Sequence, residues 1–490
     1  MQRLLFCMLT LIILQPAMAQ DDETFEEFKR REQRELQEYK DRERREFADY
    51  RKKYNEEFAA FLSSQWKRYT LQKGTPAPKQ PDPVKPTIAP KDAPQVEPRE
   101  IPHGDVMPIV IPPKEKPLEI PLPEPTPYQQ PANLLLFNTG FYVSMGNQLK
   151  FKLNGVTEKD ISKIWTRLST DVYTPLFEDC ARICQEMNFN GWATLNLCKT
   201  VSEKLLGKGT NEAAVLQTYL MAELGYDAKI VRVGSNRLVT ACPADVPLCR
   251  INYILKGNKR YYLWADVSLD AQLHTYQKNY ATASRPIDFS NTTAIALNKE
   301  ILSSRAFTSS FDNHLTVKVG VKKSLMEYYK NIPLINDWSF YARQPMDNDL
   351  KNQMIPVLKS AISGKSETEA ANLLLHFVQT AFKYETDEEQ FGYEKTDFKE
   401  EPFYHRACDC EDRSILYSDL VRTLLGLDVV LLHYPNHLCT AVKFNSDVRG
   451  DYVNVDGIKY SICDPTYINA SIGTCMPKFV NVGATVYKTR

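Results

Sequence analysis

The first clear pattern in the chain is an eleven-residue spacing of large apolar side chains within a highly charged stretch. Between residues 21 and 70, 27 of 50 side chains are charged. An eleven-residue repeat corresponds to about 3.67 residues per turn, so the apolar positions stay on one face of a helix. We predict an amphipathic helix over residues 20–73 that self-associates or docks a partner; a single solvated helix is the alternative. The repeating pairs are Phe25 and Phe28, Leu36 and Tyr39, Phe47 and Tyr50, and Phe58 and Phe61.

Near the C-terminus, the hydrophobic pattern predicts a helix followed by three strands. Apolar side chains after Cys410 fall on one helical face, and Gly426 is typical of a helix end. The alternating runs 428–434 and 437–444 predict two neighbouring strands. A third strand, 459–463, leads into Asp464-Pro465-Thr466. Helices and strands in this order indicate an α+β domain.

The N-terminus has the pattern of a secretory signal. Arg3 precedes an apolar run of about eleven residues, and Ala17-Met18-Ala19 supplies small residues at a cleavage site. A membrane-spanning helix needs about 20 residues, so this run is too short to span. We predict a signal peptide at residues 1–19, no integral membrane span, and an exported protein that is periplasmic or extracellular. An uncleaved anchor is the alternative.

Prolines separate the charged stretch from the rest of the chain. Between residues 75 and 131 lie 18 of the 30 prolines. Polyproline II rises about 3.1 Å per residue, so this stretch could reach roughly 170 Å if fully extended. We predict a linker at residues 74–131 that acts as a spacer. The remaining residues, 132–490, have ordinary globular composition and suit two domains.

The overall charge excludes one class of function. The chain has 61 basic and 61 acidic side chains, a formal net charge of zero. Nucleic-acid binding relies on a surplus of Lys and Arg over phosphate, and no block of the chain has one. We therefore expect no nucleic-acid partner, and the 43% of hydrophobic residues supports a real core elsewhere.

Three residues in the C-terminal pattern have the chemistry of a nucleophilic site. Cys410 is predicted at a helix N-terminus, where backbone N–H groups stabilise a thiolate, although Asp409, Glu411 and Asp412 oppose this. His437 opens one strand and Asp464 ends the next, so they supply a base and a group that orients it. Cys408 is the rival nucleophile. It precedes the helix and lacks an Asp two positions on, so we favour Cys410.

The order of these residues resembles the transglutaminase-like superfamily. The similarity covers residues 346–490, with Cys410-Glu411-Asp412 at the nucleophile motif, His437 at the base and Asp464-Pro465-Thr466 at the orienting acid. The resemblance implies a papain-like core in which Cys410 attacks an amide or ester carbonyl and forms an acyl-enzyme. His437 is followed by Leu438-Cys439 where many relatives have an aromatic residue, which affects substrate specificity more than the triad.

The backbone N–H of Cys410 is the natural first donor to the oxyanion in such a site. The second donor is expected from the Tyr404-His405 segment. The acyl-enzyme would then be resolved by water or by an amine.

A second, altered copy of this pattern lies about 200 residues earlier. The run 210–225 repeats the helix and its Leu-Gly end, 238–241 repeats the second strand, and 263–266 repeats the third. Matched from the helix ends, Gly209 takes the place of Cys410, Arg237 that of His437, and Asp266 that of Asp464.

Glycine offers no nucleophile and arginine does not deprotonate in proteins. We predict two tandem copies of one fold: a degenerate domain at 132–290, a connecting β region at 291–345, and a catalytic domain at 346–490. The alternative for the repeat is a generic similarity between α/β segments.

Ten cysteines remain outside the signal. Export permits disulfides, and Cys242 with Cys249, and Cys463 with Cys475, are candidate pairs. Cys180 and Cys184 lie four residues apart on a predicted helix, which suits packing or a metal. No CxxC or HExxH zinc pattern is present, so we expect no metal and no cofactor.

Two functions from different classes fit these patterns. The first is an exported cysteine-dependent amidase, protease or acyltransferase acting on a peptide or protein substrate. The second is a non-catalytic peptide-binding or scaffold protein built on the same modules. The presence of Cys410, His437 and Asp464 in one copy, and their loss in the other, favours the first.

Overall fold

The computed structural model describes residues 25–77, 86–90, 97–109, 118, 120–123, 130–290, 295–311, 315–435 and 437–490. The predicted signal peptide, 1–19, lies outside the described residues. The chain forms two units, Met1–Arg51 and Lys52–Arg490, and all packing discussed below belongs to the second. Among the described helices, none has both the length and the apolar character needed to cross a membrane.

The charged stretch forms one helix, α1 (Phe25–Leu62), as the spacing predicts, but it is shorter than expected. The predicted helix to residue 73 is wrong at its C-terminal end. The indole N–H of Trp66 donates to the Leu62 carbonyl at 3.1 Å and satisfies a carbonyl left free at the helix end. The chain then continues into two short strands, β1 (Lys67–Tyr69) and β2 (Leu71–Gln72).

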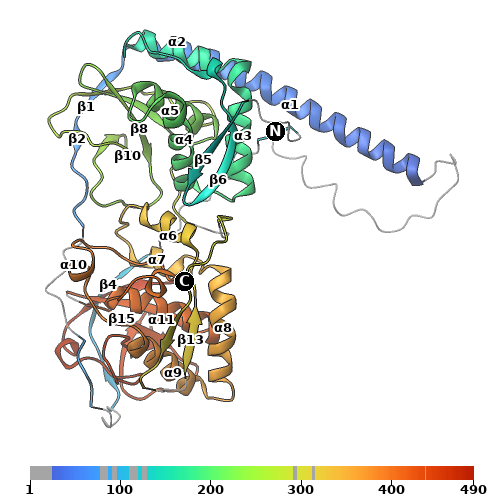
Figure 1. Ribbon diagram of the computed structural model, residues 1–490. Helices are drawn as coiled ribbons and strands as arrows, with labels where there is room; N and C mark the ends of the chain where they lie inside the picture. The colour runs from blue at the N-terminus through green and yellow to red at the C-terminus, as the bar shows by residue number, and fades with distance from the viewer. Residues whose placement is uncertain are drawn as a thin grey trace. The chain divides into compact units, whose positions relative to one another are not determined.

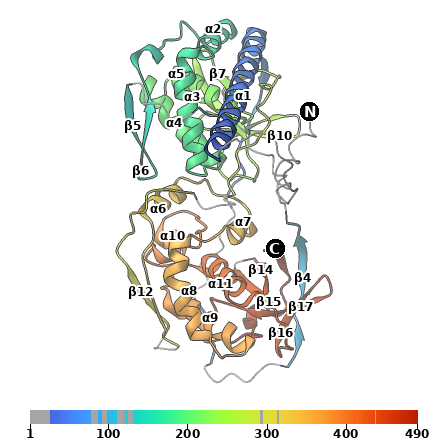
Figure 2. The same ribbon diagram turned by 90° about the vertical axis from the view of Figure 1, so that its right-hand side faces the viewer.

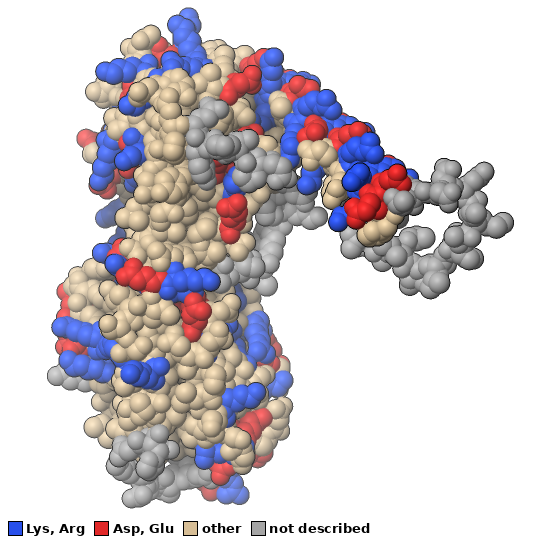
Figure 3. Space-filling model, turned by 45° about the vertical axis from the view of Figure 1, so that its right-hand side comes forward, with Lys and Arg blue, Asp and Glu red and all other residues tan. Residues whose placement is uncertain are grey.

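The aromatic stripe of α1 has two different environments. Phe58 is 3% exposed, and its ring lies 5.0 Å from that of Trp165, 5.6 Å from Tyr276 and 5.4 Å from Tyr280. The end of the stripe is therefore part of a domain core. Self-association through the rest of the stripe stays a prediction. Figure 3 shows acidic and basic side chains gathered along α1. The exposed members of the stripe are Phe25, Phe28, Leu36, Tyr39 and Tyr50.

The N-terminal globular domain contains an antiparallel sheet of seven strands in the order β1-β11-β7-β8-β10-β9-β2. Helix α5 packs against β7 and β8, and α4 packs against α5 (Figures 1 and 2). A separate hairpin, β5 (Pro131–Leu136) with β6 (Thr139–Ser144), precedes these helices. The helices are α2 (Glu158–Leu168), α3 (Thr174–Glu186), α4 (Gly191–Leu206) and α5 (Asn211–Glu223). The strands are β7 (Lys229–Val233), β8 (Arg237–Pro243), β9 (Tyr253–Lys256), β10 (Lys259–Leu263) and β11 (Leu273–Thr275).

A short hairpin and two helices connect the domains. The predicted connecting β region contains β12 (Arg305–Thr308) and β13 (Thr316–Val319), which pair antiparallel. Helices α6 (Lys323–Lys330) and α7 (Trp338–Arg343) follow.

The C-terminal domain contains a second seven-stranded sheet, in the order β3-β16-β17-β15-β14-β18-β4. Helix α11 packs against β14 and β15 on one side and against α9 on the other. The helices are α8 (Asn348–Ile362), α9 (Glu367–Ala381), α10 (Asp387–Gln390) and α11 (Cys410–Leu425). The strands are β3 (Arg99–Glu100), β4 (His103–Met107), β14 (Asp428–Tyr434), β15 (His437–Lys443), β16 (Asp451–Val455), β17 (Ile458–Cys463) and β18 (Ala484–Lys488).

Part of the proline-rich segment is not a free spacer, which corrects the sequence prediction. Strands β3 and β4 pair in parallel with β16 and β18 and close both edges of the C-terminal sheet. Arg99 bonds Asp451 at 2.8 Å, and Ile101 is fully buried. Proline is tolerated in an edge strand because the outer side of that strand needs no N–H donor. Pairing β3 and β4 with the sheet also satisfies the backbone groups that β16 and β18 would otherwise leave unpaired.

The two sheets share one strand order. Five strands of each sheet have the same spatial order relative to their order in the chain: β11-β7-β8-β10-β9 in the N-terminal sheet and β18-β14-β15-β17-β16 in the C-terminal sheet. In each sheet, two strands from an earlier part of the chain flank these five. Helix and sheet are mixed throughout the two domains, so the α+β class is confirmed.

Candidate active site

The predicted helix N-terminus at Cys410 is confirmed. Cys410 is the first residue of α11, and Asp409 caps the helix in a reciprocal pair with Asp412. Gly426 ends it in the left-handed conformation, with φ of 71°, which glycine adopts without strain. The hydroxyl of Ser414 donates to the Leu438 carbonyl at 3.0 Å, which ties the first turn of α11 to the start of β15.

His437 and Asp464 form a buried hydrogen-bonded pair. His437 opens β15, and Asp464 follows β17, which pairs with β15. The Nε2 atom of His437 lies 2.8 Å from Oδ2 of Asp464, and the residues are 3% and 2% exposed. The other carboxylate oxygen accepts the backbone N–H groups of Thr466 at 2.8 Å and Tyr467 at 3.2 Å. The carboxylate is therefore held in place from both sides.

The orientation of the His437 imidazole is also fixed, by an aromatic ring that stacks on it. The ring of Phe479 stacks on it with centroids 5.1 Å apart and an interplanar angle of 1°. The other ring nitrogen, Nδ1, is buried and has no hydrogen-bond partner within the described part of the chain. Since Nε2 is committed to Asp464, Nδ1 is the atom left to exchange a proton with a nucleophile.

Cys410 lies beside this pair but its thiol does not bond to the imidazole. The Sγ atom donates to Oε2 of Glu411 at 3.1 Å. The backbone N–H of Leu438, the residue after His437, lies close enough to the sulfur to lower the pKa of the thiol. The structure thus brings His437 and Asp464 into direct contact and places Cys410 next to the same strand, with its thiol turned to Glu411.

Burial and the Glu411 and Asp409 carboxylates raise the pKa of Cys410 well above its usual value, and the Leu438 N–H only partly offsets them. The helix N-terminus was expected to lower the pKa of Cys410, and burial with the two carboxylates outweighs this effect. The thiol holds its proton in this arrangement, so an attack on a carbonyl requires His437 to take the proton as the bond forms.

Cys408 is a poorer nucleophile than Cys410 in this fold. It is 1% exposed and pairs with Tyr384 in an isolated bridge. Burial raises the pKa of its thiol to about 12. Cys410 is partly exposed, which favours it over Cys408. The candidate disulfides are not formed: Cys242, Cys249, Cys463 and Cys475 are all free.

Several carboxyl groups, most of them buried, gather near Cys410. Asp387, Asp409 and Asp412 each offer an oxygen within 4.8 Å of one another, and so do Asp387, Glu394 and Glu411. Carboxylate oxygens are the ligand type of hard cations such as Ca²⁺. Burial and then Asp409 and Asp412 raise the pKa of Asp387 to about 11, so without a cation this carboxyl is neutral.

The protonated state of Asp387 makes stability depend on pH. A carboxyl whose pKa is raised by folding contributes its full stability below its unfolded pKa of about 4, and this stability is lost progressively as the pH rises from there to the folded pKa. Asp387→Asn mimics the protonated form and does not titrate. We expect it to increase the free energy of unfolding at pH 7.5 by about 1–3 kcal/mol and to have no effect at pH 4.

Urea unfolding at both pH values measures this effect, with the exposed Asp447→Asn as control. A loss of stability at pH 7.5 would contradict the prediction, because it would mean that the Asp387 carboxylate is ionised and held by a cation.

Three residues of the site were missed by the sequence analysis. The side-chain amide of Gln379 donates to the carbonyls of Asp464, Tyr467 and Ala470 at 2.8–3.0 Å and holds the loop after β17. Phe479 stacks on His437, and Lys478 interacts electrostatically with Asp464 and Cys410. No local motif distinguishes these residues, because each meets the site only through tertiary contact.

The expected oxyanion donor at Tyr404-His405 is not placed for that role. The backbone N–H groups of both residues donate to the Glu401 carbonyl, at 2.9 Å and 2.8 Å, so neither is free to bind an oxyanion. The His405 ring faces Asp397 and Glu401. The Leu438 N–H is instead the backbone donor that lowers the pKa of the Cys410 thiol.

When the two domains are matched from the starts of α5 and α11, Asn211 rather than Gly209 takes the position of Cys410. Asn211 is the first residue of α5, and its Oδ1 accepts the Leu238 N–H at 2.8 Å. Cys410 is likewise the first residue of α11, and the Leu438 N–H lowers the pKa of its thiol. Helix α5 is shorter than α11, so matching from the helix ends shifted the alignment. Arg237 opens β8 and donates to the Asp266 carbonyl at 2.6 Å.

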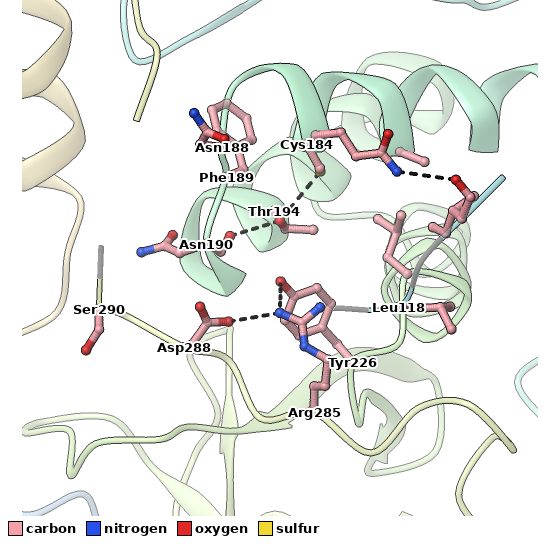
Figure 4. Close-up of a pocket in the computed structure, with 14 residues that line it drawn as sticks. Leu118, Cys184, Asn188, Phe189, Asn190, Thr194, Tyr226, Arg285, Asp288 and Ser290 are labelled. Carbon is pink, nitrogen blue, oxygen red and sulfur yellow. Dashed lines mark hydrogen bonds and ion pairs between the residues drawn. The ribbon is translucent and has the colours of Figure 1, made fainter. Parts of the chain in front are cut away.

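The N-terminal domain has a cavity of about 360 Å³ beside α3 and α4 (Figure 4). Arg285 lies between Asp288, at 3.5 Å, and the Tyr226 hydroxyl, at 3.2 Å. Leu118, from the proline-rich segment, forms part of the wall. The charges in this cavity are thus paired within the domain.

Comparison with known proteins found no similarity: no family model, no curated protein and no solved structure matches this chain.

Proposed function

We propose that the chain is an exported cysteine-dependent hydrolase or acyltransferase of amides and peptides, with Cys410, His437 and Asp464 as its triad. The observation that carries this proposal is the buried 2.8 Å bond between His437 and Asp464, with the nucleophile candidate at the adjacent helix N-terminus. Such a pair fixes the imidazole tautomer and stabilises its charged form once it has taken the thiol proton.

The chemistry then follows from the positions of the groups. Cys410 attacks the carbonyl while its proton passes to Nδ1 of His437, and the imidazolium later protonates the leaving amine. Attack requires the thiol to turn from Glu411 to the imidazole. The Leu438 N–H and the Cys410 N–H, free at the start of α11, are candidate donors to the oxyanion.

The proposal includes a papain-like core of the transglutaminase type and its duplication. The equal strand order of the two sheets and the matching contacts of Asn211 and Cys410 support a tandem copy. In the N-terminal copy an amide and a guanidinium replace the thiol and the imidazole, so that copy would bind rather than catalyse.

Alkylation of the thiols tests the proposal. Among the described cysteines, Cys184 and Cys410 are partly exposed and the others are buried. We expect iodoacetamide to label Cys410 at pH 7.5, and Cys410→Ala to remove that label while Cys184→Ala leaves it. His437→Ala is expected to slow labelling at least 10-fold, because the imidazole accepts the thiol proton.

Equal labelling of the wild type and Cys410→Ala would overturn the catalytic proposal and leave a binding protein. If Cys410 is labelled, adding a primary amine to a peptide substrate separates transfer to the amine from hydrolysis by water.

A further inference from the structure

The loop that begins at Asp464 is fastened by one buried side-chain amide. Asp464 follows β17, and its backbone carbonyl accepts a hydrogen bond from Nε2 of Gln379 at 3.0 Å. The same Nε2 atom donates to the carbonyls of Tyr467, at 2.8 Å, and Ala470, at 3.0 Å. Gln379 lies on α9 and is 1% exposed. Because one NH₂ group serves three carbonyls, this amide defines the path of the loop.

The position of the loop sets the position of the Asp464 carboxylate. The backbone N–H groups of Thr466 and Tyr467 hold Oδ1 of Asp464, at 2.8 Å and 3.2 Å. The other oxygen, Oδ2, lies 2.8 Å from Nε2 of His437. Tyr467 thus contacts Gln379 through its carbonyl and the carboxylate through its N–H. A shift of the loop therefore moves the carboxylate relative to the imidazole.

The backbone of Gln379 is tied to the helix that carries the nucleophile. Arg413, three residues after Cys410 on α11, is 1% exposed. Its guanidinium donates to the Gln379 carbonyl at 3.1 Å and to the Phe382 carbonyl at 2.7 Å. Helices α9 and α11 pack side by side (Figure 2). Through its main chain and its side chain, Gln379 links the elements that carry Cys410 and Asp464.

His376 determines which way the Gln379 amide points. Nδ1 of His376 lies 2.9 Å from Oε1 of Gln379. Since the NH₂ group faces three carbonyls, Oε1 is an acceptor, and Nδ1 must therefore carry the imidazole proton. His376 is 5% exposed, and burial lowers its pKa, which favours the neutral ring. The ring of Phe311 stacks on the imidazole, with centroids 3.7 Å apart.

We propose that Gln379 is a positioning residue that holds the Asp464 carboxylate against His437, and that His376 keeps the Gln379 amide in the required orientation. This role rests on the proposed function, because it assigns Gln379 to the triad of that site. Gln379 acts through Asp464 and its loop. A displacement of about 1 Å in a group that orients the reaction can slow it roughly 10²-fold, so losing this amide is expected to affect the rate strongly.

The test measures acylation of Cys410 by p-nitrophenyl acetate in the full mature chain. Gln379→Met keeps the length of the side chain and removes its N–H donors. We expect it to slow acylation by about 30- to 100-fold, because the carboxylate is no longer held at its distance from His437. Gln353→Met is the matched control and is expected to leave the rate unchanged. Gln353, on α8, fastens the Gly320 backbone by bonds of the same kind.

Double-mutant chains separate positioning from a general loss of structure. If Gln379 acts through Asp464, Gln379→Met is expected to slow a chain that already carries Asp464→Asn by less than about 3-fold. His376→Phe keeps an aromatic ring beside Phe311 and removes the donor to Gln379. It is expected to slow acylation by about 3- to 10-fold alone, and to have no further effect together with Gln379→Met.

Proton NMR gives a readout that does not need catalysis. In a chain carrying Cys410→Ala, the proton between Nε2 of His437 and Oδ2 of Asp464 is expected to give a downfield signal that Asp464→Asn removes. We expect Gln379→Met to shift or broaden this signal, and Gln353→Met to leave it unchanged.

A wild-type acylation rate in Gln379→Met, an equal loss of rate from this substitution with and without Asp464→Asn, or an unchanged NMR signal would each overturn the proposal. If the wild-type chain is not acylated at Cys410, the proposed function fails, and the NMR signal alone then decides whether Gln379 positions Asp464.

Discussion

Asp464→Asn is expected to lower the rate of Cys410 acylation by about 10³-fold or more, a loss of about 4 kcal/mol of transition-state stabilisation. The reason lies in how the carboxylate is held. One oxygen accepts the N–H groups of Thr466 and Tyr467, and the other accepts from His437. An asparagine must keep its oxygen toward the two backbone donors, so its NH₂ group faces the imidazole.

That orientation of the asparagine forces His437 into the tautomer that cannot accept the thiol proton. With a donor opposite Nε2, His437 must carry its proton on Nδ1, and Nδ1 then cannot accept the thiol proton of Cys410. The rate falls although Asp464 touches neither the nucleophile nor the substrate. Asp464 is therefore a positioning residue in this site.

Release of p-nitrophenol from p-nitrophenyl acetate measures the acylation rate, and mass spectrometry locates the acetyl group on Cys410. The expected change is in the rate constant of acylation. Asp266→Asn, just after β10 of the N-terminal sheet, is the matched control and is expected to leave the rate unchanged. A variant Asp464→Asn with the wild-type rate would mean that His437 is not oriented by this carboxylate.

Phe58→Ala is expected to reduce the free energy of unfolding by about 3–5 kcal/mol, as for other buried aromatic side chains replaced by alanine. Phe58 is 3% exposed and meets the rings of Trp165, Tyr276 and Tyr280. Its removal leaves a cavity between α1 and the N-terminal domain. The adjacent Asn55 bonds Glu223 at 2.5 Å, so the helix end is held by polar contacts as well.

Phe28→Ala is the matched control because it is the same substitution on the same helix, at a position that is 44% exposed. Its effect is expected to stay within about 0.5 kcal/mol. Urea unfolding followed by tryptophan fluorescence measures both variants. Equal effects would contradict the assignment of the end of α1 to the core of the domain.

The sequence was most informative where local pattern dictates structure. The helix from Cys410 to Gly426 and the strands that open at Asp428 and His437 follow from apolar periodicity, a helix-ending glycine and alternation. The pairing of His437 with Asp464 depends on β17 lying next to β15, although β16 comes between them in the chain. Neighbouring antiparallel strands bring the start of one beside the end of the other.

Other features depend on contacts between distant parts of the chain. The edge strands β3 and β4 come from a segment whose proline content predicts a spacer, and they are recruited because a sheet edge exposes unpaired backbone groups. Asn211 takes the place predicted for Gly209 because helix lengths differ between the domains.

By itself, the sequence determined which residues could do chemistry and on which elements they lie, because helix ends and strand alternation are local properties. The tertiary structure decided the protonation and the orientation of these residues. Burial and neighbouring carboxyl groups raise the pKa of the Cys410 thiol against the effect of its helix, and contacts from Gln379 and Phe479 fix the Asp464 loop and the His437 ring.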